Sequence, residues 1–508
     1  MGQTNPLVGR QLSKTPDVKV LSGTHGSNCG HGPVSSQDGR ATIASRSQQR
    51  EIEPSPPPDP MTASEVLPAR RRDIPVTKRE IFGWAMFDFA NSCYTTVVIT
   101  AVYSAFFVSQ IVPTGSTARD SYWSTAILLS MVVSLVLAPL TGAIIDKSGK
   151  KKTWLVASCL ICAVGTAGLY FVGPGQIWPA IFLIVVGNTG FMLSESFCAS
   201  FLPDLSTPET MGKISGLGWG VGYFGGLASV FLASKVIITA DPAVDQALYV
   251  HQNQLAMLAM GAFFVIAALP TFLLVHNRSL PEPGFERASM GRLVRAGLDE
   301  FKGTFETARR HQVLFQFLIA FMVYMAGLDA IVKFVGIYAR EEIHLTGGEF
   351  VKLFLFLQLS AVAGALGFGW LEGKLGPKRT VMLTLMWWIA GILGIYFLDA
   401  LVQLTGMGPK DLFYGLGLFA GAGIGATQAS SRTVVGLLAP RDKSAQMFGF
   451  WGMFSRFGSI LGVGFGFVAD GFGSRRAGIL LVLIFFVVGA LLLSRVDIDR
   501  GMRDAQAA

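Results

Sequence analysis

The chain has 508 residues, of which 51% are hydrophobic and only 15% are charged, and its mean hydropathy is +0.49. This composition is too apolar for an ordinary soluble protein and is typical of a polytopic membrane protein, so we expect a lipid bilayer around it. The net charge of +8 does not predict nucleic-acid binding, because the Lys and Arg residues lie mostly in alternate short loops.

The residue types that hold metals or cofactors form no recognisable set. The five cysteines are odd in number, and Cys159-x-x-Cys162 lies in an apolar segment without a His or Lys neighbour. We therefore expect packing residues there and no redox pair. The six histidines are scattered, and no glycine-rich turn ends in Gly-Lys-Ser/Thr. The sequence predicts no metal, no cofactor and no ATP site.

Residues 1–75 are rich in Ser, Gly, Pro and charge, with a proline-rich stretch at 54–60. A segment of this kind has too little apolar surface to fold, so we predict a disordered N-terminal tail. It contains no apolar core of signal-peptide length. Met61 is a second candidate initiator, and N-terminal peptides upstream of it in mass spectrometry would exclude that start.

Apolar segments that can cross a bilayer, about 20 residues each at ~1.5 Å per residue, follow the tail without a break. We predict twelve transmembrane helices, which makes the chain an all-α polytopic membrane protein. The predicted spans are 81–111, 121–145, 153–173, 177–202, 212–236, 254–276, 313–338, 350–372, 380–400, 411–437, 445–469 and 476–494.

The one long internal hydrophilic stretch of the sequence falls between the sixth and seventh spans. We predict two six-helix halves, 76–276 and 312–495, which are joined by a cytoplasmic linker at 277–311 and followed by a cytoplasmic tail at 496–508. Lys and Arg are concentrated in this linker and in the loops expected on the same side. The positive-inside rule therefore places both termini in the cytoplasm.

A short basic turn interrupts the apolar pattern at two matching places. Residues 142–153 read GAIIDKSGKKKT between the second and third spans, and residues 369–380 read GWLEGKLGPKRT between the eighth and ninth. The second copy has Gly373 in the place of Asp146, with Glu372 beside it. The repeat indicates duplication of a membrane unit, and hence two pseudo-symmetric halves. A positive-inside hairpin with no other role would explain a single copy equally well.

Ionisable residues well inside the predicted spans are few, and most of them fall on every third helix. Each would cost about 2.5–3.5 kcal/mol if it faced lipid at the bilayer centre. We therefore expect the first, fourth, seventh and tenth helices to line a hydrated cavity that receives these side chains. The residues are Asp88, Glu195, Asp329, Lys333, Arg432 and Arg456.

The first span has the clearest polar face. Trp84, Asp88, Asn91 and Thr95 recur at helical spacing, so they share one side of the helix. Glycine recurs at every fourth position in the fifth span, from Gly218 to Gly226, which predicts close helix packing. Asn188 and Gln428, on the fourth and tenth spans, are further candidates for hydrogen bonding in the cavity.

Roles for the charged residues follow from their positions. Glu195 and Arg432 each lie eight residues before a proline, which suggests equivalent places in the two halves and a pair that breaks on opening. A fixed ion pair is the equal alternative. Asp329 and Lys333 are four residues apart and can neutralise each other.

Two further roles concern ligands. Asp88 or Asp329 are the candidate proton carriers. Arg456 is a candidate partner for a substrate carboxylate, or alternatively a helix anchor.

Two sets of motifs resemble a known family. The turn at Gly142, Asp146, Lys147 and Gly149 resembles the loop between helices 2 and 3 of the major facilitator superfamily, which implies that Asp146 grips neighbouring helix ends in a cytoplasmic gate. Gly83-Trp-Ala-x-x-Asp-Phe-Ala-Asn-Ser92, Leu202-Pro-Asp204 and Gln428-Ala-Ser-Ser-Arg432 are similar to the vacuole-effluxer branch of that superfamily.

The resemblance covers roughly residues 80–495 and implies that the first, fourth, seventh and tenth helices surround a central path. It also implies amino-acid export. The segment from Asp329 to Lys333 departs from the family pattern, which leaves ligand contacts there in doubt.

We therefore expect a secondary transporter, not an enzyme, that moves a small polar solute by alternating access, with protons as a candidate coupling ion. It is expected to act as a monomer in the cell membrane of a bacterium or in an organelle membrane of a eukaryote. A channel or a non-transporting sensor on the same fold is the alternative. A membrane-embedded enzyme would need a compact catalytic set, and the acids of the spans have no histidine partners.

Overall fold

The computed structural model describes residues 74–113, 119–462 and 475–507, and every regular element within these ranges is helical. The predicted tail therefore lies almost wholly outside the described residues, as does the end of the span predicted at 445–469. The helices are α2 (Lys78–Cys93), α3 (Tyr103–Phe106), α4 (Arg119–Ser148), α5 (Lys151–Gly168), α6 (Ile177–Ala199), α7 (Leu202–Leu205), α8 (Met211–Phe231), α9 (Gln246–Leu274), α10 (Met290–Lys302), α11 (Thr304–Arg310), α12 (Gln312–Glu341), α13 (Gly347–Leu375), α14 (Pro377–Tyr396), α15 (Leu398–Thr405), α16 (Pro409–Leu438), α17 (Ser444–Gly462), α19 (Arg475–Ser494) and α20 (Ile498–Ala507), with the short helical turns η1 (Tyr94–Ala101), η2 (Phe107–Ile111), η3 (Leu169–Phe171), η4 (Leu232–Ile237) and η5 (Arg441–Lys443).

Each of the twelve predicted spans coincides with one of these helices or with a run of them. By length and composition, nine helices in the described ranges can cross a membrane, and α19 together with α20, bent by 57°, gives a tenth. The predicted tenth and eleventh spans correspond to α16 and α17, whose glycines, serines and arginines make them less apolar. Within the described ranges, the spans predicted from hydropathy are thus present as helices.

Side-chain caps fix the starts of some of the helices. The Thr77 hydroxyl accepts a hydrogen bond from the Glu80 backbone N–H (3.2 Å) and fixes the start of α2. Asp245 does the same for α9, where its carboxylate accepts from the Leu248 N–H (2.9 Å). The sixth helix therefore begins before the predicted residue 254, because its first two turns are too polar to register in a hydropathy pattern.

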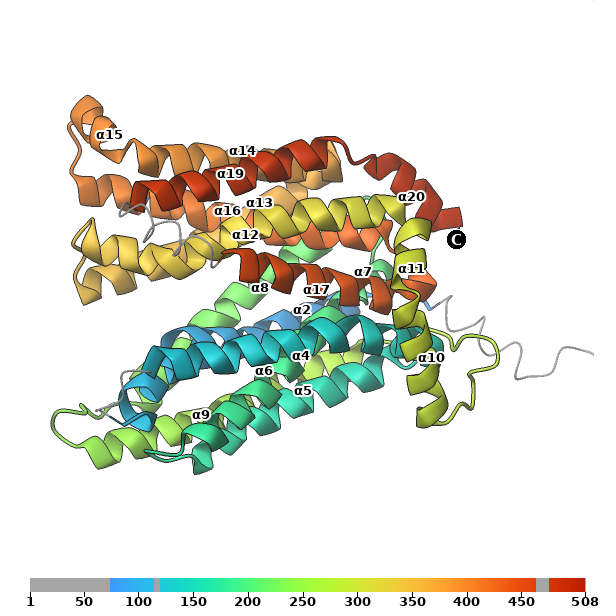
Figure 1. Cartoon of the computed structure of the whole chain (residues 1–508), viewed down its shortest axis with the longest axis horizontal. Helices are drawn as coiled ribbons and strands as arrows, with labels where there is room; N and C mark the ends of the chain where they lie inside the picture. The colour runs from blue at the N-terminus through green and yellow to red at the C-terminus, as the bar shows by residue number, and fades with distance from the viewer. Residues whose placement is uncertain (1–73, 114–118, 463–474, 508) are drawn as a thin grey trace, which may run out of the picture. The chain divides into compact units, whose positions relative to one another are not determined.

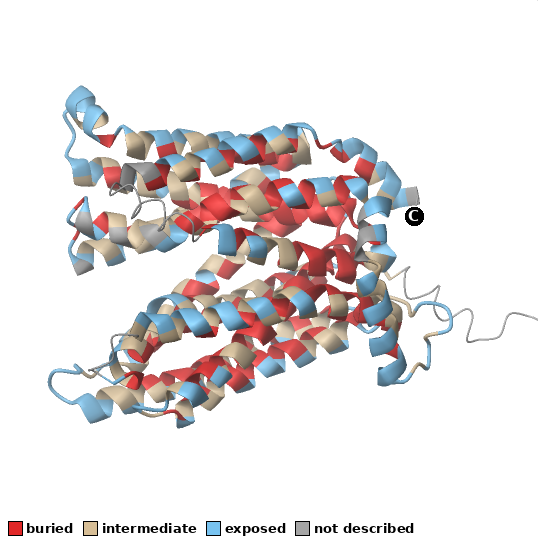
Figure 2. Ribbon diagram, in the orientation of Figure 1, coloured by how far each residue is buried: buried red, intermediate tan, exposed pale blue. Residues whose placement is uncertain are grey.

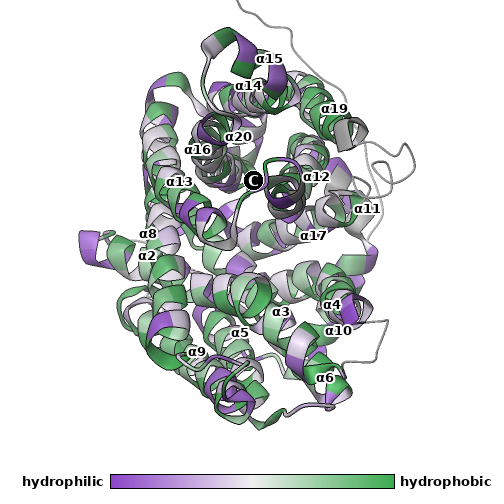
Figure 3. Ribbon diagram, turned by 90° about the vertical axis from the view of Figure 1, so that its left-hand side faces the viewer, coloured by the Kyte–Doolittle hydropathy of each residue, from purple (hydrophilic) through white to green (hydrophobic). Residues whose placement is uncertain are grey.

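The helices form two groups, each around its own apolar core. The first half, α2 to α9, contains a cluster with Trp84, Phe87 and Phe264, and the second half, α12 to α19, contains one with Phe321 and Trp388. Figure 3 looks along the helices and shows α2, α5, α6 and α9 in one group and α12, α14, α16 and α19 in the other.

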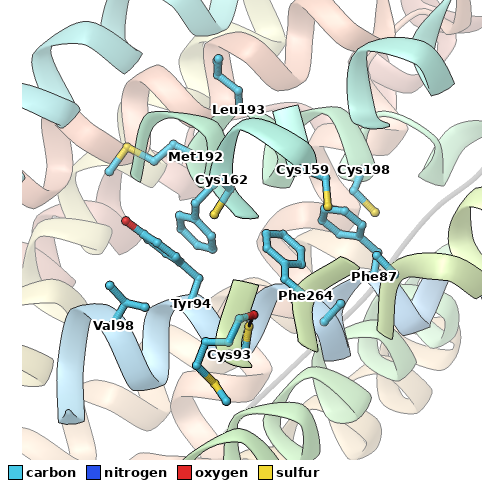
Figure 4. Packing of buried hydrophobic residues seen from close by; sticks show 14 of the residues in the cluster. Phe87, Cys93, Tyr94, Val98, Cys159, Cys162, Met192, Leu193, Cys198 and Phe264 are labelled. Atoms are coloured by element: carbon cyan, nitrogen blue, oxygen red, sulfur yellow. Dashed lines mark hydrogen bonds between the residues drawn. The ribbon is translucent and has the colours of Figure 1, made fainter. Parts of the chain in front are cut away.

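The core of the first half explains the cysteine pattern. Cys93, Cys159, Cys162 and Cys198 are free thiols, and all four are buried. Figure 4 shows them among Phe87, Tyr94 and Phe264, on the sides of helices that face one another. The Cys-x-x-Cys spacing therefore places two small packing residues on one face of α5, as predicted.

Apolar side chains also cover the outside of the bundle. On α4, Leu128, Leu129, Val132 and Val136 are each about half exposed, and they recur along one face. Figure 2 shows buried residues concentrated where the halves meet and exposed ones around the rim. Such a stripe of leucine and valine on a helix of 30 residues suits contact with lipid.

The linker between the halves contains α10 and α11, which run across the ends of the longer helices (Figure 1). We call this the linker end of the bundle. The first buried contact of the linker is made by Arg278, whose guanidinium donates two hydrogen bonds to the Glu80 carboxylate (2.5 and 2.8 Å). These bonds raise the pKa of Arg278, so the pair stays charged and anchors the linker to α2.

Candidate functional site

A small cavity lies between the two halves and is lined by α2, α6, α8, α16 and α17. Its volume is about 60 Å³, which is room for a few water molecules. The lining residues are Asp88, Asn91, Ser92, Thr95, Phe191, Glu195, Trp219, Gly222, Arg432 and Trp451. A larger groove of about 730 Å³, beside Val156 and Leu160 on the surface of α5, contains none of the predicted site residues.

The cavity contains an ion pair between the halves. Arg432 on α16 donates from Nη1 to Asp88 Oδ2 on α2 at 2.8 Å, and the two side chains are 4% and 14% exposed. Two charges with so little exposed surface require partners, because an unpaired one would cost several kcal/mol. The ion pair across the interface thus offsets the free-energy cost of burying these two charges.

Arg432 also contacts Ser215 and two tryptophan rings. Its Nε and Nη2 donate to the hydroxyl (3.1 Å) and the carbonyl (2.7 Å) of Ser215 on α8. Its guanidinium carbon lies 4.8 Å from the ring centre of Trp84 and 5.5 Å from that of Trp219, which are cation–π distances. The Trp84 indole N–H donates to the Cys198 carbonyl (2.9 Å), so the ring itself is fixed.

Gly218 makes room for this pair. A Cβ at that position would lie 2.7 Å from Arg432 Nη2 and 2.9 Å from the Trp84 ring, which are closer than real Cβ atoms come. The glycine pattern of the fifth span therefore serves the close approach that we predicted, and in addition it accommodates a charged group.

A second ion pair joins the halves beside the first. Arg456 on α17 donates from Nη2 to Glu195 Oε2 on α6 at 3.0 Å, with side chains 12% and 21% exposed. The suggested pair of Glu195 with Arg432 is thus not the one in the structure. Each residue has another partner, because Arg432 faces α2 and α8, and Arg456 is the arginine that faces α6.

Several polar atoms around the cavity are buried without a hydrogen-bond partner among the described residues. They comprise two indole N–H donors, of Trp219 and Trp451, the Nε of Arg456 and the Oδ1 acceptor of Asn91. Such groups are costly to leave unpaired, so their gathering at one cavity indicates a place for water or for a polar ligand.

The other predicted cavity residues lie elsewhere. Asn188 donates to Ser130 on α4 (2.6 Å) and packs within the first half. Asp329 and Lys333 form the predicted i, i+4 pair on α12 at 2.7 Å, partly exposed and outside the cavity lining. Gln428 is one turn before Arg432 but does not line the cavity, and its Oε1 is buried without a partner in the described part of the chain. Trp84 contacts Arg432 but is not one of the residues that line the cavity.

Three contributors were missed from the sequence. Trp219 and Trp451 look like ordinary aromatic residues in apolar spans, and Ser215 is one of many small residues. The position of Trp219 could have indicated its role, since it follows Gly218, the first glycine of the stripe on α8. No such indication exists for Trp451.

The predicted gate residues lie at the linker end, where the halves meet closely. Asp146 accepts hydrogen bonds from the backbone N–H groups of Ala445 (3.1 Å) and Gln446 (2.7 Å), at the start of α17. A carboxylate suits this place, because helix N-termini have unpaired N–H groups. A Cβ on Gly142 would come within 2.5 Å of the Ala445 carbonyl oxygen, so glycine permits the contact.

The basic residues of the turn add further contacts between elements. Lys151 is 1% exposed and donates to Asp204 (2.9 Å) in the first half and to the Ser444 hydroxyl (2.6 Å) in the second. Lys147 forms ion pairs with Glu282 (2.8 Å) and Glu300 (2.9 Å) of the linker. Gly149 has φ +63°, the left-handed conformation that glycine adopts most easily.

The second copy of the turn holds a buried acid. Glu372 is 5% exposed and lies against α8, where a Cβ on Gly212 would be 2.9 Å from its Oε1. Its Oε2 has no hydrogen-bond partner, and no cation that the structure describes forms an ion pair with it. Although Gly373 occupies the position that matches Asp146 in the first copy, Glu372 still supplies an acid at this interface.

The chemistry of the site is that of polar recognition. Within the described ranges, no three His, Cys, Asp or Glu side chains gather as metal ligands. The cavity offers two acids, the Arg432 guanidinium, two indole N–H groups and an amide oxygen, and Arg456 pairs with one of the two acids beside it.

Comparisons with known proteins agree with this architecture. A family model described as "Vacuole effluxer Atg22 like" matches residues 76–506. An uncharacterized MFS-type transporter, YxiO of Bacillus subtilis, is 26% identical over 424 residues, which cover 82% of this chain and 94% of the relative. Autophagy-related protein 22 of Kluyveromyces lactis is 24% identical over 405 residues, covering 74% and 80%.

Solved structures share the fold at low identity. The proton:xylose symporter XylE has a TM-score of 0.62 at 13% identity, and the match covers 84% of this chain and 97% of the XylE chain. The transporter FucP in its outward conformation has a TM-score of 0.61 at 14% identity, covering 84% and 99%. The predicted fold class is confirmed, and the relatives are transporters and not enzymes. The chain belongs to the Atg22-like vacuole effluxer family, and it is a multi-pass membrane transporter of the major facilitator type.

Proposed function

We propose that this protein is a secondary active transporter that moves a zwitterionic solute, of the amino-acid class, by alternating access. The observation that carries the proposal is two ion pairs that join opposite halves at one cavity, Asp88 with Arg432 and Glu195 with Arg456. Three of these four residues, all but Arg456, line the cavity. Rocking of the halves would have to separate both pairs.

A zwitterionic solute can take the place of the ion-pair partners that this movement separates. Its carboxylate is complementary to the Arg456 guanidinium and the nearby Trp451 N–H, which lacks a partner in the described structure. Its ammonium group is complementary to the Glu195 carboxylate and the free Asn91 oxygen. The cavity of about 60 Å³ is too small for the solute, so binding requires the halves to open.

Proton coupling is part of the proposal, with Glu372 as the carrier. Asp88 and Asp329, the candidates from the sequence, are each engaged in an ion pair, at 2.8 and 2.7 Å. Glu372 is buried between the halves without one. Opening of the linker end would expose it to water, so its affinity for a proton would change between the two states.

The linker end is proposed to face the cytoplasm, because the basic turn at 147–152 and the arginine-rich linker lie there. The family description names a vacuole effluxer, which supports export of solute from a compartment. In a bacterial cell the corresponding membrane is the cell membrane.

Thermal unfolding of purified protein with each of the common amino acids tests the substrate class, since a ligand that binds the folded form raises its apparent stability. We expect at least one amino acid to raise the melting temperature, and Glu195→Gln to abolish the rise. Asp329→Asn makes the same change outside the cavity and is expected to retain it.

Proteoliposomes then test transport. We expect saturable uptake of the same amino acid that depends on a pH gradient. Binding without flux would indicate a sensor, and flux that never saturates would indicate a channel. Either result would contradict the proposal.

A further inference from the structure

The linker helix α10 has three distinct faces. Leu293 and Gly297 are buried against α4, where a Cβ on Gly297 would lie 2.6 Å from Ile144 Cγ1. A neighbouring face presents Met290, Val294 and Leu298, which are 58%, 36% and 41% exposed. These residues are four apart, so they form one continuous apolar stripe along the helix.

The position of α10 indicates what covers this stripe. The exposed face of α4 that suits lipid includes Val132 and Val136, and at the same spacing of four it continues to Leu140 and Ile144, which α10 covers. Ile144 is eight residues beyond Val136, about 12 Å along the helix. α10 therefore lies beside the last two turns of a membrane-spanning helix, where the apolar layer of the bilayer gives way to headgroups.

The direction of α10 fits the same place. It runs across the ends of the long helices, hence along the membrane surface, and it lies at the edge of the bundle next to α4 (Figures 1 and 3). Its third face holds Arg292 and Arg295 together with Asp299, which forms an ion pair with Lys302 at 3.8 Å, and Arg287 precedes the helix. No described residue forms an ion pair with Arg287 or Arg295, and both are exposed.

We infer that α10 is an interfacial helix that binds the surrounding bilayer, with Met290, Val294 and Leu298 in the boundary between acyl chains and headgroups. Arg287 and Arg295 bind the phosphates of anionic lipids. An apolar stripe flanked by basic residues on a helix parallel to the surface has the chemistry for this contact.

The same helix also touches both halves. Glu300 on α10 forms an ion pair with Lys147 of the first half (2.9 Å) and lies 4.0 Å from Lys443, which precedes α17 in the second half. Seating α10 in anionic lipid therefore stabilises a contact that closes the linker end. The inference does not depend on the identity of the solute.

Site-directed spin labelling in lipid nanodiscs tests the inference. The four described cysteines are buried, so Cys29→Ser leaves a background for single labels at Val294→Cys, Leu298→Cys and, as the control on the polar face, Arg295→Cys. Relaxation by oxygen reports apolar surroundings, and relaxation by a water-soluble nickel chelate reports water. We expect the oxygen-to-nickel ratio at 294 and 298 to exceed that at 295 several-fold.

Nanodiscs of phosphatidylcholine alone and of phosphatidylcholine with phosphatidylglycerol separate the two parts of the contact. We expect the ratio at 294 to rise with the anionic lipid, and Arg287→Gln/Arg295→Gln to cancel that rise. Equal nickel access at 294 and 295 would overturn the inference, as would an anionic-lipid effect that the double variant retains. Spectral broadening that disappears when labelled protein is diluted with unlabelled protein would assign the stripe to a second copy, which also overturns it.

Discussion

The ion pair of Asp88 with Arg432 gives the sharpest test of the site, by replacement of Arg432 with glutamine. The change leaves Asp88 buried without its cation, and it also removes two hydrogen bonds to Ser215 and the contact with Trp84. Removal of one partner from a buried pair costs about 3–5 kcal/mol. For a half of roughly 200 residues, each kcal/mol shifts the melting temperature by about 2–4 °C, so we expect a loss of about 6–20 °C.

The companion variant Asp88→Asn should cost less, because Arg432 keeps its bonds to Ser215. A loss of about 1.5–3 kcal/mol is expected, the contribution of a hydrogen bond to a charged group. In the double variant the two losses should overlap, with a coupling of about 0.5–3 kcal/mol. In the Cys29→Ser background a thiol-reactive fluorogenic dye can follow unfolding, since Cys93, Cys159 and Cys162 are buried and become accessible when the first half opens.

The partly exposed pair of Asp329 with Lys333 provides the control. Its side chains are 24% and 38% exposed, so Lys333→Gln should cost under about 1 kcal/mol. If the losses from Arg432→Gln and Asp88→Asn added within about 0.5 kcal/mol, the two charges would not be coupled, and the argument from burial would fail.

Three further changes test the packing and the linker end. Gly218→Ala should cost about 1–3 kcal/mol by displacing Arg432, whereas Gly220→Ala, which meets only the flexible Leu366 side chain, should be near neutral; equal melting temperatures for the two variants would contradict the account. Asp146→Asn loses one of the acceptors for the N–H groups of α17 and should cost about 1–3 kcal/mol in the same assay, while an unchanged melting temperature would show that these bonds contribute nothing. Glu372→Gln keeps the size of the side chain and removes its charge, so we expect retained folding and solute binding with loss of the dependence of flux on a pH gradient; unchanged coupling in proteoliposomes would exclude Glu372 as the proton carrier.

Much of the architecture could be predicted because hydropathy and repetition act over long stretches. The spans and the linker follow from runs of about twenty apolar residues, and the role of Asp146 was implied by the resemblance of its turn to the loop of the major facilitator superfamily. The gathering of Asp88, Glu195 and Arg432 at one cavity follows from the cost of exposing charge to lipid. The arguments for the spans and for the cavity need only the order of residues and the presence of a bilayer, whereas the one for Asp146 also needs the family.

The pairing of those charges could not be predicted in the same way. Arg432 and Arg456 are on neighbouring long helices, and which of them meets Glu195 depends on how each helix is rotated about its axis. Glu195 and Arg432 each precede a proline, Pro203 and Pro440, by eight residues. This equal spacing indicates equivalent positions in the two halves, and equivalent positions need not be in contact. Glu372 is not among the predicted site residues, because Gly373 occupies the position that aligns with Asp146, although a side chain one residue away reaches the same interface.

The position of Arg432 between Trp84 and Trp219 gives the protein an optical signal of its own. A cation near an indole ring alters the energy of the excited state, so separation of the halves should change the emission of these two residues without any attached label. Subtracting the spectrum of Trp219→Phe would isolate the emission of Trp219 from that of the other tryptophans. Movement of the central charge could then be followed in real time in unmodified membranes.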